Sequence, residues 1–148
     1  MKSFTYVYAG NAFRLCDDCC GQAVGVTATY VVGDNAHDNH AIIDAADRSD
    51  IWVHLKDIPS CHVILHLVVD EEILKDAGSK RKKVYRDILR KATRQGGVIC
   101  RQHSKTSVRN AGLGKSKVGV VAYSVGNIEK SVVPGQVFTH GESMSFAV

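Results

Sequence analysis

The stretch from Lys82 to Gln95 constrains the fold most, because its apolar residues recur at helical spacing between segments of a different pattern. Side chains three and four residues apart share one face of an α-helix, so the stretch predicts an amphipathic helix. The pair Gly96–Gly97 that follows predicts where this helix ends. We therefore expect one helix whose apolar face packs on strands from earlier and later parts of the chain.

Short β-branched runs closed by turn residues lie on both sides of this helix, without a regular strand–helix–strand repeat. This order favours an α+β domain with a largely antiparallel sheet and the central helical segment packed on one face. Two shorter helices are expected earlier in the chain, at 39–46 with Asp38 as the cap and at 70–77. Strands are expected at 4–9, 23–32, 51–55, 62–69, 98–100, 118–123, 127–133 and 136–139, with a hairpin turn at Gly126–Asn127.

The length of 148 residues suits one domain, and 45% hydrophobic with 23% charged residues is ordinary globular composition. We therefore expect a single domain over residues 1–148. No apolar run reaches the ~18 residues of a membrane span, and the start of the sequence lacks the charged and apolar regions of a secretion signal. The sequence therefore predicts a cytoplasmic protein with no membrane partner.

Positive charge is concentrated in one part of the sequence. Between Ser79 and Val118 stand 13 lysines and arginines against one acid, Asp87. This segment carries +12, which leaves −8 for the rest of a chain whose net charge is +4. Such a separation of charge points to an anionic partner, most often nucleic acid or a lipid surface.

Two basic groups within this segment are the candidate binding residues. The first group recurs every four residues, which places its charges in one row about 6 Å apart along a helix. The second group lies in the glycine-containing stretch SVRNAGLGKSK, which we expect to be a loop that can follow an anionic backbone. The predicted nucleic-acid-binding residues are Lys82, Arg86, Arg90 and Arg94 in the row, and Lys105, Arg109, Lys115 and Lys117 in the second group.

Two clusters of metal-ligating residues leave an alternative function open. Histidines that fall on the predicted central strands would suffice for a catalytic zinc site if they met; they are His54, His62 and His66. A CxxCC cluster is half of a structural zinc site or a group of reactive thiols, and consists of Cys16, Cys19 and Cys20. Five cysteines, an odd number, do not indicate a disulfide framework, so we expect reduced thiols. We expect no metal, no cofactor and no catalytic residue, and retain a metal- or thiol-dependent enzyme as the alternative.

The pattern YVVGDNAHDNHAIIDAADRSD at residues 30–50, followed by IWVHLKDIPSCHVILHL at 51–67, resembles the NFACT-R domain. This module is found in the NFACT proteins of ribosome-associated quality control and, standing nearly alone, in a coiled-coil protein linked to DNA sensing. The segment 107–124 resembles the closing block of that domain, so the resemblance covers most of 30–133 and leaves residues 1–22 unplaced. The matching residues are Gly33, Asn35, Asn39, Asp50, Trp52, His54, Pro59 and His62.

The sequence also departs from the family pattern at two places. Asp34 stands where the family usually has an arginine, and Ser60–Cys61 stands where Gly-Ser is usual before the second histidine. The resemblance implies RNA binding, to tRNA or ribosomal RNA, in translation or ribosome-associated quality control. Ribosomal or quality-control proteins are the candidate protein partners. A DNA-binding module and a protein-interaction module remain alternatives to RNA binding.

Overall fold

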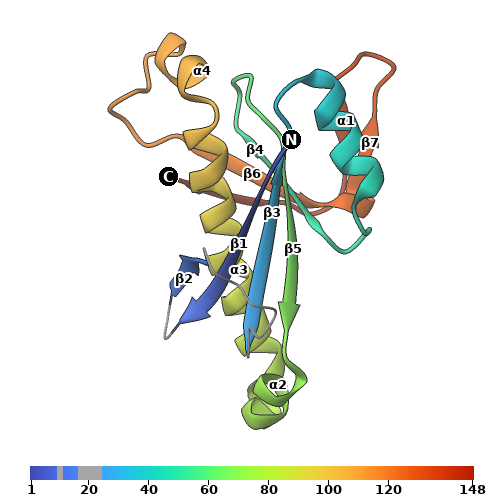
Figure 1. Cartoon of the computed structure of the whole chain (residues 1–148), viewed down its shortest axis with the longest axis vertical. Coiled ribbons are helices and arrows are strands. Elements are labelled where there is room, and N and C mark those ends of the chain that lie inside the picture. The colour runs from blue at the N-terminus through green and yellow to red at the C-terminus, as the bar shows by residue number, and fades with distance from the viewer. Residues whose placement is uncertain (10–11, 17–24) are drawn as a thin grey trace.

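The computed structural model of the chain describes residues 1–9, 12–16 and 25–148. A curled antiparallel sheet of seven strands forms its framework, in the order β2-β1-β3-β5-β4-β6-β9 (Figure 1). Its strands are β1 (Lys2–Ala9), β2 (Ala12–Leu15), β3 (Val26–Val32), β4 (Ile51–Leu55), β5 (Val63–Val69), β6 (Gly119–Ser124) and β9 (Met144–Ala147). A separate hairpin joins β7 (Ile128–Lys130) to β8 (Val137–Thr139). The expected α+β class with an antiparallel sheet is confirmed.

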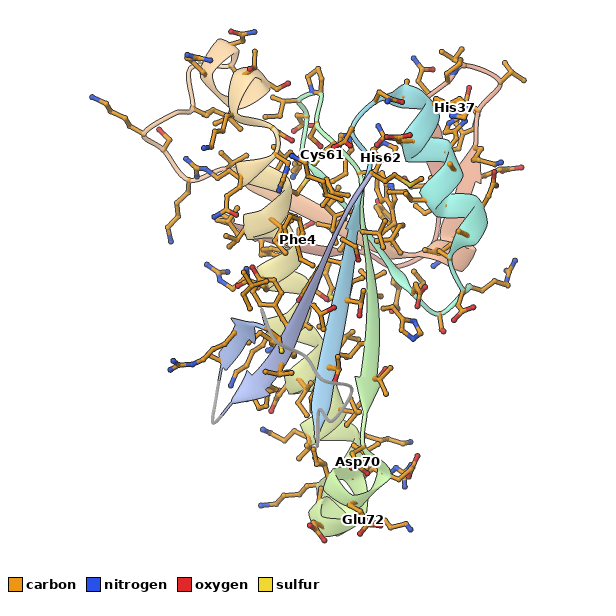
Figure 2. All side chains as sticks on the ribbon, viewed as in Figure 1. Phe4, His37, Cys61, His62, Asp70 and Glu72 are labelled. Carbon is orange, nitrogen blue, oxygen red and sulfur yellow. The ribbon has the colours of Figure 1, made fainter. Side chains whose placement is uncertain are left out.

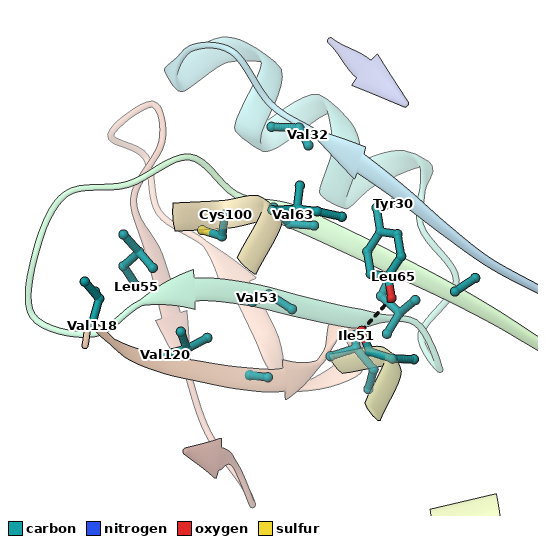
Figure 3. Close-up of a cluster of buried hydrophobic side chains, with 14 of the residues drawn as sticks. Tyr30, Val32, Ile51, Val53, Leu55, Val63, Leu65, Cys100, Val118 and Val120 are labelled. Carbon is teal, nitrogen blue, oxygen red and sulfur yellow. Dashed lines mark hydrogen bonds between the residues drawn. The ribbon is translucent and has the colours of Figure 1, made fainter. Parts of the chain in front are cut away.

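The helix α3 (Arg81–Gln102) crosses one face of the sheet and buries the main core against it. Alternate residues of β3 point toward this core, which gives the strand its strict burial alternation. Tyr30 ties the sheet to the helix, because its hydroxyl donates a hydrogen bond of 2.6 Å to the carbonyl of Ala92 (Figure 3). Burial raises the pKa of Tyr30 well above its ordinary value, so this hydroxyl stays protonated and available as a donor.

The expected end of this helix at Gly96–Gly97 is wrong, because α3 continues to Gln102. Both glycines are buried where the helix approaches the sheet closely. A Cβ atom on Gly96 would lie 3.3 Å from the ring of Tyr30, and one on Gly97 would lie 2.8 Å from the ring of Phe146. These glycines therefore allow close packing rather than ending the helix, and the strand expected at 98–100 is part of α3.

The opposite face of the sheet is covered by α1 (Ala36–Ala45). Its Ile42 and Ile43 pack with Trp52 of β4 and Ile64 of β5 in a second, smaller core. The expectation that Asp38 caps this helix is wrong. Asn35 is the cap, because its side-chain oxygen accepts a hydrogen bond of 2.9 Å from the backbone N–H of Asp38.

The remaining elements connect the sheet to α3 and extend it. The short helix α2 (Glu71–Ala77) lies in the range that the sequence predicts, and Asp70 caps it. Two elements were not anticipated, β9 and the short helix α4 (Lys105–Asn110). The expected hairpin at Gly126–Asn127 is wrong, since a 3₁₀ turn follows β6, and β6 pairs with β4 and β9 rather than with β7. Within the described residues, no helix is both long enough and apolar enough to cross a membrane.

Candidate nucleic-acid interface

The predicted row belongs to α3 and reaches solvent along the helix. All four of its side chains are exposed. No carboxylate of residues 1–9, 12–16 or 25–148 forms an ion pair with any of them. The guanidinium of Arg94 lies 6.0 Å from the ring centre of Phe146, which orients this end of the row toward β9. The row therefore presents its charge to solvent.

Other cations of the same helix have partners. Lys83 pairs with Asp87 at 2.9 Å, and this hydrogen bond lowers the pKa of the Asp87 carboxyl. Arg81 pairs with Glu71 at 3.2 Å. Lys91 donates a hydrogen bond of 3.1 Å to the hydroxyl of Tyr8. Lys83, Arg81 and Lys91 are thus partnered, whereas the four cations of the row have no carboxylate partner among the described residues.

Three of the four cations in the second predicted group, Lys105, Arg109 and Lys115, line a cleft at the far end of α3. The sequence predicted a loop for the whole second group, and this is wrong for its first two residues, because Lys105 and Arg109 belong to α4. Lys115 and Lys117 lie in the segment between α4 and β6. The cleft has a volume of about 800 Å³ and a partly apolar floor, and its lining includes Val98, Arg101, Lys105, Val108, Arg109, Lys115 and Val148.

Arg101 holds the walls of this cleft together. One of its guanidinium nitrogens donates a hydrogen bond of 2.6 Å to the carbonyl of Val148, and another donates one of 3.3 Å to the carbonyl of Gly114. These bonds attach the segment after α4 to α3. Sequence reasoning did not single out Arg101, because the helix was expected to end at Gly96–Gly97, before this residue.

The row and the cleft are continuous. Arg94, Val98 and Gln102 recur every four residues on α3, and the last two line the cleft. With a rise of 1.5 Å per residue, the row ends about 6 Å before the cleft begins. The helix α4 follows α3 at its C-terminal end (Figure 1), so the row ends about one helical turn before the cleft that three cations of the second group line. We call the eight predicted cations the cationic face.

The residues that carry the family resemblance gather around His62 instead. The backbone N–H of Gly33 donates to the His62 carbonyl at 3.0 Å. The N–H of His62 donates to the side-chain oxygen of Asn39 at 3.2 Å, and the indole N–H of Trp52 donates to Nδ1 of His62 at 3.1 Å. The ring of His54 stacks on Trp52 with centres 5.3 Å apart. This network joins the ends of β3 and β5 to α1 and β4.

The network requires its histidines to be neutral. Burial, with smaller contributions from His54 and His40, lowers the pKa of His62 to about 3. Burial also lowers the pKa of His54, against a hydrogen bond to the Leu55 carbonyl that raises it. Because Nδ1 of His62 accepts a hydrogen bond, its protonation would remove that acceptor. Both groups therefore act in packing and hydrogen bonding rather than as cations.

Two further motif residues lie around this network. Pro59, in the segment between β4 and β5, lines the same cleft as Asn35 and Asn39. Asp50 accepts a hydrogen bond of 3.0 Å from the backbone of Asp47 and lies 2.6 Å from Nδ1 of His66. Most of the eight motif residues are buried or half-buried, whereas Asn35 and Pro59 are exposed, and the cationic face contains none of the eight.

The structure does not bring the three candidate histidines together as a metal site. His54 and His62 contact each other, with ring centres 5.2 Å apart, whereas His66 pairs with Asp50. In the described part of the chain, one group of three residues has ligand atoms close enough to hold a metal ion, namely Asp47, Asp50 and His66 within 4.8 Å. The sequence did not reveal it, because the group depends on the pairing of β4 with β5.

The cysteines divide into two sets. Cys16 is disulfide-bonded, so the expectation of reduced thiols is wrong for it. Cys19 and Cys20, the other members of the predicted cluster, lie outside the described residues. Cys61 and Cys100 are free thiols and lie side by side between the β4–β5 segment and α3.

Comparison with known proteins defines the fold alone. No protein-family model matches the sequence, and no curated protein matches it. The chain is similar to a solved structure of the C-terminal of the fibronectin/fibrinogen-binding protein from Streptococcus suis, with a TM-score of 0.51 and 22% sequence identity. The match covers 82% of this chain and 41% of that chain, so this chain spans about two-fifths of the length of that structure. At this identity the similarity establishes a shared architecture and no more.

Proposed function

We propose that this chain is an NFACT-R-like domain that binds the backbone of structured RNA through the cationic face. The proposed ligand is tRNA or ribosomal RNA, in translation or ribosome-associated quality control. One observation carries the proposal: exposed cations without carboxylate partners among the described residues run along α3 to the cleft beside α4. The sequence resemblance supplies the biological context.

Phosphate groups supply the negative charge that this face lacks. Lysine and arginine bind phosphates without reading base identity, so selectivity for sequence should be weak. Neutralising four to six phosphates gives a slope of about −3 to −5 for log affinity against log salt, since each contact contributes about −0.7 to −0.9. A fourfold rise in salt should then weaken binding by about fiftyfold or more.

Two double variants with the same change in net charge test the location of the contact. Arg86→Gln with Arg90→Gln removes two cations of the row. Lys75→Gln with Lys130→Gln is the matched control, because both lysines already have carboxylate partners, Glu72 and Asp44. Fluorescence anisotropy with labelled tRNA, across 50–200 mM salt, gives the affinity and slope for each.

The row variant should lose affinity and flatten the slope by about 1.4 to 1.8, the share of two contacts, while the control should match the parent chain. Equal effects of the two variants, or an affinity that salt leaves unchanged, would reject the proposal.

DNA is the alternative ligand, because its backbone offers the same phosphates. Competition between tRNA and duplex DNA of equal length decides between them.

A further inference from the structure

A pair of thiols lies at the junction of α3 with the segment that joins β4 to β5. The Sγ atoms of Cys61 and Cys100 are 3.7 Å apart, although the residues are 39 positions apart in sequence. Each sulfur also lies near the backbone carbonyl of the other residue, at 3.5 Å and 3.3 Å. The two residues are therefore packed against each other through both backbone and side chain.

The two thiols differ in access to solvent. Cys61 is partly exposed and lines a cleft of about 660 Å³, at the end of the sheet near α1 and α4 (Figure 2). Cys100 is fully buried. A small solute that enters the cleft reaches the sulfur of Cys61 first, and Cys100 lies directly behind it.

The surroundings of Cys61 favour its thiolate. Hydrogen bonds with Cys100 and from the hydroxyl of Ser104, the latter at 3.5 Å, lower the pKa of Cys61 against the effect of burial. The same coupling, together with burial, raises the pKa of Cys100. Lys2, Lys105 and Asp34 also line the cleft and contribute two positive charges and one negative charge. A thiolate that solvent can reach, beside a protonated thiol, is the arrangement of reactive and resolving cysteines.

We propose that Cys61 and Cys100 form a peroxide-sensitive dithiol in which Cys61 reacts and Cys100 resolves the product to a disulfide. The Cys61 thiolate attacks one oxygen of hydrogen peroxide; the O–O bond breaks, and Cys61 sulfenic acid and hydroxide form. The sulfur of Cys100 then attacks the Cys61 sulfur; the S–S bond forms, the S–O bond breaks, and water leaves with the Cys100 proton. Two thiols lose two electrons and one peroxide is reduced to two waters.

Formation of the Cys61–Cys100 disulfide needs only a small movement of the two residues. The sulfurs must approach by about 1.6 Å to reach the bond length of a disulfide. Cys61 lies in residues 56–62, a segment without helix or strand, which can shift more readily than the helix that carries Cys100. The product would join this segment to α3 next to Ser104, which directly precedes α4.

Tryptic mapping provides the test, because the two cysteines fall in different peptides, Asp57–Lys75 and Gln95–Arg101. The other three cysteines share a third peptide, Leu15–Arg48. Folded protein is treated with hydrogen peroxide, blocked with N-ethylmaleimide, digested and analysed by mass spectrometry. We expect the first two peptides to be joined with the loss of two hydrogens, reversibly with dithiothreitol, and at least tenfold faster than in urea-unfolded chain.

Two variants separate the roles of the thiols. Cys100→Ser should stop at Cys61 sulfenic acid, which dimedone traps. Cys61→Ser should leave Cys100 as a thiol that is labelled only after unfolding. The proposal is overturned if Cys61 of the unmodified chain resists peroxide, oxidises to sulfinic acid without forming the link, or joins the Leu15–Arg48 peptide instead.

Discussion

Lowering the pH is expected to destabilise the fold through His62. This side chain is almost fully buried and accepts the indole N–H of Trp52 on Nδ1. Its pKa is lowered to about 3 in the folded chain, mainly by burial, whereas an unfolded histidine titrates near 6.5. A base whose pKa is depressed by folding stabilises the fold above its unfolded pKa. That stability is lost as the pH falls from about 6.5 toward 3.

The size of the effect follows from the difference between the two pKa values. Each unit of pH below 6.5 removes about 1.4 kcal/mol until the folded pKa is reached. At pH 4.5 the loss from His62 alone is therefore about 2 to 3 kcal/mol, and a folded pKa one unit higher changes this result little. Domains of this size have about 5 to 15 kcal/mol of stability, so the effect is large enough to measure.

The assay compares the parent chain with His62→Asn. The side-chain oxygen of asparagine is three bonds from Cα, as Nδ1 is, so the variant keeps an acceptor for Trp52 without a titrating group. Urea unfolding is followed by circular dichroism and by the fluorescence of Trp52, the single tryptophan, at pH 7.5 and 4.5. The variant should lose about 2 to 3 kcal/mol less stability than the parent over this interval.

The experiment needs a control variant and a stated outcome that would refute the role of His62. His37→Asn makes the same substitution at an exposed position of α1 and should follow the parent chain. Carboxylates titrate in the same range in every variant, so the difference between variants isolates His62. If the parent and His62→Asn lose the same stability between pH 7.5 and 4.5, the reasoning from burial and the Trp52 hydrogen bond is refuted.

Three further changes should alter stability in urea unfolding at neutral pH. Gly97→Ala should destabilise by about 1 to 2 kcal/mol, because the contact with Phe146 and Val120 outweighs the helical preference for alanine; an increase in stability would contradict the close packing. Tyr30→Phe should lower stability by about 1 kcal/mol through loss of the hydrogen bond to Ala92, and an unchanged midpoint would argue against that bond. If the Cys61–Cys100 disulfide forms, closing a loop of about 40 residues should stabilise the oxidised chain by up to about 4 kcal/mol, and Cys61→Ser should abolish this gain.

Local patterns account for what the sequence predicted correctly. The apolar stripe of α3 and the strand Ile51–Leu55 follow from periodicity within one element. The cationic row followed from the same helical spacing. The two glycines of α3 were misread, because glycine is common at helix ends. In this fold Gly96 and Gly97 instead allow the rings of Tyr30 and Phe146 to pack closely against the helix. The cap of α1 was predicted as Asp38 but is Asn35. Both residue types are good caps, and the choice between them depends on where the chain enters the helix.

Contacts between distant segments account for what the sequence did not reveal. The approach of Cys61 to Cys100 requires α3 to lie on the face of the sheet beside the β4–β5 segment. The Asp50–His66 pair requires the antiparallel register in which Ile51 lies opposite Leu65. Neither arrangement leaves a mark in spacing or composition. Such sites become visible only when the order and register of the strands are known.

Under the proposed function, the network of family-like residues serves the fold and the cationic face serves RNA binding. The network around His62 fixes α1 and the strand ends, whereas the cations lie on α3 and in the segment from α4 to β6, and among them Lys105 lines the same cleft as Asn35 and Asn39. Substitution of His62 should therefore alter stability with little effect on RNA affinity at neutral pH. Removal of Arg86 and Arg90 should do the reverse, because both are exposed. If the His62 variant, still folded, lost RNA binding as strongly as the row variant, the ligand would contact the network side and the cationic face would be solvated charge.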